Sequence, residues 1–209
     1  MADDNLQPEP LTVTQFLTAA GLFEGGLLLL AFGLGWLCGV YPTSELSWSL
    51  TDFGMGLVAT IPMLMLFAAC WLSRSNGMRQ IRFFLRDSIG PLLDQCRGID
   101  ILFLALLAGI CEEVLFRGFL FQWIRPFNLT LAILVTNLIF GITHSITPLY
   151  AFLAGLMGLY LTALMTVDST PNLLVPLTAH AAYDYVAFVF VLRDYRQHQE
   201  LLNSSSENT

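Results

Sequence analysis

The sequence predicts an all-α protein, a polytopic transmembrane helical bundle with about six spans. Of its 209 residues 56% are hydrophobic and only 12% are charged, whereas a soluble domain is about half apolar and about a quarter charged. The apolar residues form long continuous runs, which is typical of membrane helices. The formal net charge is −7 and all nine basic residues are arginine, a balance that would repel phosphate backbones. These observations exclude a disordered chain, a nucleic-acid binder and an ordinary soluble enzyme.

Each span is justified by its length. A bilayer core of about 30 Å needs roughly 20 mainly apolar residues in one helix. Prolines and an arginine-rich segment over 74–98 separate the candidate runs. The six runs are 16–40, 53–72, 99–124, 128–147, 149–167 and 172–192. The predicted organisation is a polar N-terminal segment over 1–15, one transmembrane domain over 16–195 and a polar C-terminal tail over 196–209.

The arginines predict the orientation. They gather between the second and third runs and after the sixth, which lie on one side of a six-span protein: Arg74, Arg79, Arg82, Arg86, Arg97, Arg193 and Arg196. That side is expected to be the cytoplasm, so both termini are expected there. The N-terminal MADDNLQPEP has no positive segment, which argues against a cleavable signal peptide. A bacterial plasma membrane is the default host, and an internal membrane such as a thylakoid would give the same pattern.

Three smaller features have structural interpretations. Segment 78–89 places arginines on one face and apolar residues elsewhere, as in an interfacial helix. The first run holds two G-x-x-x-G spacings, for which packing within the bundle is the default and a dimer seam the alternative. The four cysteines form no C-x-x-C pair and are expected to be free, buried thiols. They are Cys38, Cys70, Cys96 and Cys111.

Six ionisable residues stand inside otherwise apolar runs. Each charge costs on the order of 3 kcal/mol in hydrocarbon, so each requires a partner or a function. The third run carries Glu112, Glu113 and Arg117, and further motifs are F-x-x-x-H in the fourth run and H-x-x-x-D in the sixth. These two motifs are formed by Phe140 with His144 and by His180 with Asp184.

Helical spacing separates the roles of the two glutamates. Glu113 and Arg117 are four residues apart, in the favourable order for an ion pair. Glu112 is turned about 100° away, so one carboxylate is neutralised and its neighbour remains free. A buried free carboxylate near an imidazole is suited to act as a general base for water. The structural interpretation is that these residues only clamp the helices together, which fits Glu113 and Arg117 whatever the others do.

The three motifs, in this order on successive membrane helices, resemble the CPBP family of type II CAAX-prenyl endopeptidases and bacteriocin-processing or immunity (Abi) proteins. The resemblance covers roughly residues 99–192. It implies an intramembrane glutamate endopeptidase without a cofactor, acting on a peptide or protein that is prenylated or membrane-embedded, in contact with membrane lipids and not with nucleic acid.

The resemblance also implies roles. Glu112 would activate water, His144 would help to hold it, and Glu113 with Arg117 would form a supporting pair beside Phe140. His180 with residue 184 would stabilise the oxyanion. The best-known members carry asparagine there, whereas this chain has Asp184. Because an ionised carboxylate cannot donate a hydrogen bond, Asp184 would have to be protonated or instead orient His180.

Three alternatives remain open. Glu112, His144 and His180 could bind zinc and leave its fourth position to water, although no H-E-x-x-H motif is present. A scaffold, assembly or immunity protein could use the same fold without catalysis. A proton or ion transporter could also use buried Glu, His and Asp residues, but no internal repeat supports it.

One difficulty arises from the predicted limits. On straight helices the two histidines differ in depth by on the order of 15 Å. Their convergence requires tilted spans, displaced limits, or a break near Gly141 or Pro176.

Overall fold

The computed structural model describes residues 11–166 and 171–206. Over these residues the chain is helical and has no strand, which confirms the predicted all-α membrane bundle. The ten N-terminal residues and the last three, part of the predicted polar ends, lie outside the described residues. The helices are α1 Val13–Cys38, α2 Leu50–Leu72, α3 Asn76–Phe84, α4 Gly90–Asp94, α5 Gly98–Glu113, α6 Gln122–Ile124, α7 Leu129–Thr143, α8 Pro148–Thr166 and α9 Leu174–Ser206.

Two π-helical segments continue these helices without a break. One, η1 Leu85–Ile89, joins α3 to α4, and the other, η2 Val114–Phe121, joins α5 to α6. Four helices are long and apolar enough to cross a membrane within the described ranges, namely α1, α2, α8 and α9, and α7 is a shorter apolar helix. The α5–η2–α6 run carries the buried charges. The count of six spans therefore stays a prediction.

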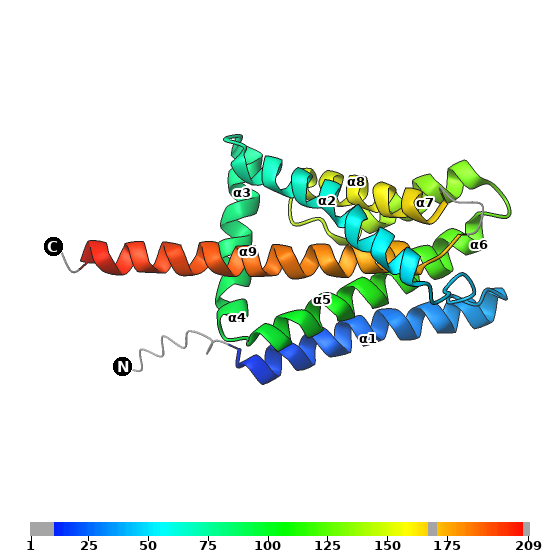
Figure 1. Ribbon diagram of the computed structural model, residues 1–209, viewed down its shortest axis with the longest axis horizontal. Helices are drawn as coiled ribbons and strands as arrows, with labels where there is room; N and C mark the ends of the chain where they lie inside the picture. The colour runs from blue at the N-terminus through cyan, green and yellow to red at the C-terminus, as the bar shows by residue number, and fades with distance from the viewer. Residues whose placement is uncertain (1–10, 167–170, 207–209) are drawn as a thin grey trace, which may run out of the picture.

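The helices are arranged around α9 (Figure 1). This helix passes through the centre, with α1 and α5 on one side of it and α2, α7 and α8 on the other. Both described chain ends lie at the same end of the bundle as α3 and α4. Local sequence sets the ends of several helices: Ser49 and Asn128 accept backbone N–H groups at the starts of α2 and α7, and Gly39 adopts a left-handed conformation after α1.

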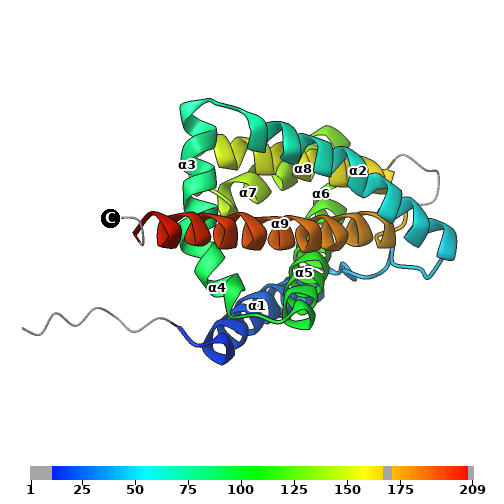
Figure 2. The same cartoon turned by 60° about the vertical axis from the view of Figure 1, so that its left-hand side comes forward.

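The arginine-rich segment forms an elbow of α3, η1 and α4 that crosses the end of the bundle, nearly perpendicular to α9 (Figure 2). Within the elbow, the side chain of Ile81 of α3 is buried. Nη1 of Arg82 donates to the carbonyl oxygens of Trp71 at 2.6 Å and Ser73 at 2.7 Å, and so satisfies the C-terminal end of α2. Arg82 therefore holds the elbow to the bundle, a role that an arginine face on an interfacial helix did not predict.

The glycines and cysteines of the predicted spans divide by environment. A Cβ atom at Gly21 or Gly25 would meet nothing within 4 Å, so packing within the bundle was the wrong interpretation for this pair. All four cysteines are free, as predicted, but only Cys96 and Cys111 are buried; Cys70 is half-buried and Cys38 is exposed. Between α4 and α5, burial raises the pKa of the Cys96 thiol, which keeps it in the unreactive thiol form.

Two helix limits differ from the prediction. The fourth run ends at Thr143 instead of residue 147, since His144 already has non-helical dihedral angles at the C-cap of α7. The sixth run continues as helix through Ser206, well beyond residue 192. An ion pair between Arg196 and Asp94 joins this extension to α4, with 2.6 Å between Nε and Oδ1.

Candidate active site

A fully buried ion pair forms the foundation of the site. Nη1 of Arg117 donates to Oε1 of Glu113 over 2.8 Å, and both side chains have no exposed surface. The same Oε1 accepts from Nδ1 of His180, also at 2.8 Å. The pair expected from the four-residue spacing is therefore present, and it extends to a histidine on α9. Partners on all sides offset the large cost of burying these charges.

Arg117 is held by groups that the sequence motifs did not include. Its Nη2 donates to the carbonyl oxygen of Gly158 over 2.7 Å and to Oδ1 of Asn137 over 3.3 Å. Its Nε donates to Oγ1 of Thr162 over 3.4 Å, and its guanidinium lies 4.6 Å from the centre of the Phe140 ring. One arginine thus ties η2 to both α7 and α8. Both Asn137 and Thr162 are polar residues inside apolar runs, and this was the sequence signal that could have identified them as part of the site.

Glu112 faces a second group of polar atoms. Its Oε2 lies 3.5 Å from Nε2 of His144 and 4.0 Å from Nε2 of His180. Oδ2 of Asp184 lies 3.5 Å from the same nitrogen of His180. Oε2 of Glu112 is buried and has no hydrogen-bond partner in the described part of the chain. The structure therefore brings together all four residues that the motifs nominated for catalysis.

The hydrogen bonds of the two histidines determine which ring nitrogen is free. Nδ1 of His144 lies 2.8 Å from the carbonyl oxygen of Phe140. A carbonyl oxygen can only accept, so this nitrogen carries the proton and Nε2 is left for the site. Nδ1 of His180 likewise donates to Glu113. Both Nε2 atoms consequently face the carboxylate of Glu112.

Close helix contacts bring these residues within reach of one another. A Cβ atom on Gly109 would lie 2.8 Å from Ala181, beside His180, so glycine allows α5 to approach α9 closely. At Gly158 an added Cβ would lie 2.8 Å from Oδ1 of Asn137 and 3.0 Å from Nη2 of Arg117. Glycine at 158 therefore lets Arg117 reach the backbone of α8. The sequence offered no partner for either glycine.

The π-helical segment η2 begins directly after Glu113 and includes Arg117. A π-helix is wider than an α-helix and is often found at functional sites. Here η2 also packs closely against the loop after α1. A Cβ atom on Gly118 would overlap the carbonyl oxygen of Pro42, so glycine is needed at this contact. The π-helical segment was not predicted, since a widened helical turn is a consequence of packing and has no sequence signature.

Both histidines converge on Glu112 in spite of the predicted difference in depth. Neither Gly141 nor Pro176 breaks a helix; α7 ends instead at Thr143, with His144 as its C-cap. Pro176 instead lies in the first turn of α9, where proline is tolerated.

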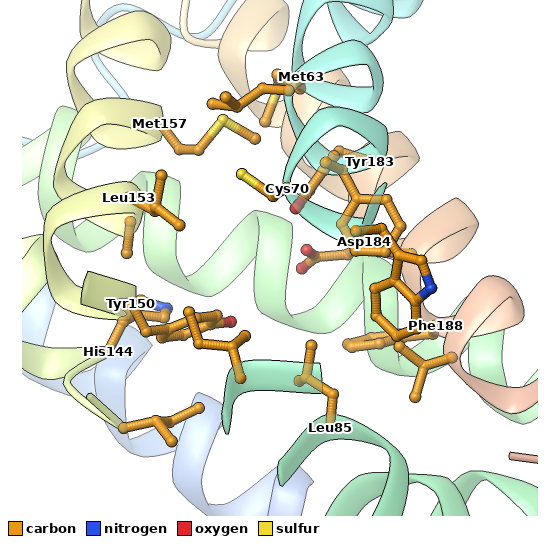
Figure 3. A pocket seen from close by; sticks show the side chains of 18 of the residues that line it. Met63, Cys70, Leu85, His144, Tyr150, Leu153, Met157, Tyr183, Asp184 and Phe188 are labelled. Carbon is orange, nitrogen blue, oxygen red and sulfur yellow. The ribbon is translucent and has the colours of Figure 1, made fainter. Parts of the chain in front are cut away.

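A cavity of about 280 Å³ opens beside the site. Its walls come from α2, the elbow, α7, α8 and α9, and are mainly apolar. Figure 3 shows Asp184 and Tyr150 reaching into it from opposite walls, with Met63 and Met157 at one end. His144 and His180 also line it. The polar site therefore lies in the wall of a space suited to an apolar group.

The zinc alternative has a donor set of the right chemistry, one carboxylate and two imidazoles. Over residues 11–166 and 171–206, however, no group of three or more His, Cys, Asp or Glu side chains is arranged to hold a metal ion.

One buried acidic residue lies outside the three motifs. Glu24 of α1 is only 9% exposed and interacts electrostatically with Glu112, His144, His180 and Asp184. Sequence reasoning missed it, although a carboxyl group in the middle of the first apolar run was the same signal that singled out the others.

Comparisons with known proteins agree with the motifs. Residues 97–186 match the family model described as type II CAAX prenyl endopeptidase Rce1-like. No curated protein matches the chain. No solved structure matches it. The matched segment contains every residue of the three motifs. The resemblance inferred from the sequence is thereby confirmed, and residues 97–186 of this membrane protein are similar to the Rce1-like type II CAAX prenyl endopeptidases.

Proposed function

We propose that this protein is an intramembrane endopeptidase in which Glu112 activates water for hydrolysis of a peptide bond. The observation that carries the proposal is the convergence of Oε2 of Glu112 with Nε2 of His144 and Nε2 of His180, at 3.5 Å and 4.0 Å. Three ionisable groups from three separate helices meet here, and the two histidines also line the cavity. Packing alone does not require this arrangement.

The reaction follows from the free atoms of the site. A water molecule between Glu112 and His144 donates one O–H to Oε2 and the other to Nε2, since both are acceptors. As the water oxygen bonds to the substrate carbonyl carbon, its proton passes to Glu112. The carbon–nitrogen bond then breaks, and Glu112 returns this proton to the leaving amine. No covalent acyl-enzyme forms, because no serine or cysteine of the site has a base beside it.

Stabilisation of the oxyanion is assigned to His180. Its Nε2 lies between the carboxylates of Glu112 and Asp184, which favour a proton on this nitrogen. The resulting N–H donates to the developing oxyanion in a site from which bulk water is excluded. Before the oxyanion forms, Asp184 accepts this N–H, with 3.5 Å between Oδ2 and Nε2, and so orients the ring without donating a hydrogen bond itself. The N–H then turns from Asp184 to the oxyanion as its charge develops.

The cavity indicates the substrate class. Its apolar walls favour a peptide that carries a bulky apolar group or is itself embedded in the bilayer, and a prenylated C-terminal peptide is such a substrate. The elbow and the arginine-rich ends of the helices are placed on the cytoplasmic side by the positive-inside rule. The host membrane would be a bacterial plasma membrane or an internal membrane, with lipids as the surrounding partners.

The test is cleavage of prenylated and unprenylated peptides by the purified protein in liposomes. The wild type is expected to cleave the prenylated peptide, and Glu112→Gln to reduce kcat by about 10²- to 10⁴-fold. Glu45→Gln, in the α1–α2 loop, serves as the matched control. Cleavage by Glu112→Gln at the wild-type rate would disprove the role of Glu112, and absence of cleavage by the wild type would favour a non-catalytic scaffold on this fold.

A further inference from the structure

Glu24 is a buried carboxyl group that the reaction above does not use. Glu24 lies in α1, outside the segment similar to the endopeptidases. Its side chain is nine-tenths buried, and its Oε2 has no hydrogen-bond partner among the described residues. Oε2 of Glu112 is also buried without a hydrogen-bond partner among the described residues. Of the three such carboxyl oxygens in the described residues, Oε2 of Glu113 belongs to the ion pair with Arg117, which leaves those of Glu24 and Glu112 to be explained.

Packing brings together the two helices that carry these carboxyl groups. Helices α1 and α5 start at the same end of the bundle and run side by side in the same direction (Figures 1 and 2). Leu28 and Ala31 of α1 belong to the core that contains Val114 and Leu115. Glu24 precedes Leu28 by one turn on the same face of α1. One turn back along α5 from that contact lies Glu112.

The electrostatic environment agrees with this placement. Among charged neighbours, Glu112 has the largest effect on Glu24, followed by Asp184, His180 and His144. Cys111, adjacent to Glu112, also interacts with Glu24. A further buried carboxylate beside Glu112 and Asp184 would be strongly repelled, whereas a neutral carboxylic acid would not. A neutral acid is also a donor, which is what an unpartnered carboxylate oxygen lacks.

We propose that Glu24 and Glu112 form a carboxyl dyad, in which the neutral acid of Glu24 donates a hydrogen bond, directly or through one water, to Oε2 of Glu112. The dyad rests on the proposed function for its catalytic consequence. Glu24 is then a positioning residue: it holds the Glu112 carboxylate in one orientation, ionised and ready to accept a proton from the attacking water. It takes no proton away from the reaction and does not contact the substrate.

Conservative and apolar variants separate this role from simple packing. Glu24→Gln keeps an N–H donor of the same length, so its kcat is expected to stay within about threefold of wild type. Glu24→Leu fills the space but cannot donate. Its kcat is expected to fall by about 10- to 100-fold, the effect of one hydrogen bond to a charged group. Its KM should not change, because Glu24 does not line the cavity. Phe23→Leu, on the exposed side of α1, is the matched control.

An infrared measurement tests the dyad without relying on catalysis. The carbonyl stretching band of a protonated carboxyl group should be present in the wild type and lose intensity in Glu24→Gln. It should not lose intensity in Phe23→Leu. Full kcat in Glu24→Leu, or an unchanged band in Glu24→Gln, would overturn the dyad. If the wild type cleaves no peptide, the proposed function fails, and the infrared comparison still decides whether Glu24 is the buried acid.

Discussion

His144 reaches Glu112 with only one of its ring nitrogens: Nε2 lies 3.5 Å from Oε2 of Glu112, while Nδ1 is bound to the carbonyl oxygen of Phe140 at 2.8 Å. The carbonyl fixes the ring and its tautomer. This arrangement is how a histidine on a short helix can hold a water molecule against a carboxylate.

The first prediction concerns this histidine. His144→Ala is expected to lower kcat by about 10²-fold or more, because the attacking water loses one of its two acceptors. Stability should change little, since His144 is a partly exposed C-cap residue. Peptide cleavage and thermal unfolding in detergent measure the two effects. His198→Ala, beyond the site on α9, is the control, and equal activity in both variants would contradict the assignment.

The sequence predicted the helices, and the residues that lie together at the candidate site, better than it predicted their contacts. Apolar runs located the helices, because the bilayer sets the length of a span. Ionisable residues inside those runs singled out Glu112, His144 and His180, which the structure brings together. The early end of α7, the wide turn of η2 and the approach of Gly158 to Arg117 escaped prediction. Each arises from packing between helices distant in sequence, for which no local pattern exists.

The second prediction separates stability from catalysis at the buried ion pair. Arg117→Met is expected to destabilise the protein by about 3–5 kcal/mol, because Glu113 is left as an uncompensated buried charge. The double variant Glu113→Gln, Arg117→Met should recover much of this loss. It should remain inactive, because Nδ1 of His180 no longer has its carboxylate partner. Chemical unfolding in mixed micelles and peptide cleavage give the two readouts; equal stability of single and double variants would refute the coupling.

The third prediction compares two glycines. Gly158→Ala is expected to cost about 1–3 kcal/mol, since its Cβ atom would crowd Asn137 and Arg117. Gly25→Ala should be neutral or stabilising by up to about 1 kcal/mol, because its Cβ atom meets nothing within 4 Å. Thermal unfolding of the two variants in parallel measures the difference. A destabilised Gly25→Ala protein would instead indicate that α1 has a partner helix in the membrane.

The fourth prediction concerns metal dependence. Since the attacking water is held by Glu112 and His144 in the proposed reaction, a strong chelator should leave peptide cleavage unchanged. Elemental analysis of the purified protein should find zinc well below one equivalent. Loss of activity in chelator, restored by added zinc, would replace the glutamate mechanism with the zinc alternative.

The last prediction distinguishes the two roles considered for Asp184. If its carboxylate only orients His180, the amide oxygen of Asn can accept the same N–H, so Asp184→Asn should keep kcat within about tenfold of wild type. Asp184→Leu provides no acceptor. It should lose about 10²-fold in kcat, because the His180 ring can then turn away from the oxyanion. Both substitutions remove the carboxylate beside Nε2 of His180, at 3.5 Å, so any difference between them reports hydrogen bonding rather than charge. Equal loss in both variants would mean that the negative charge itself is required, and that Asp184 acts by keeping the proton on His180.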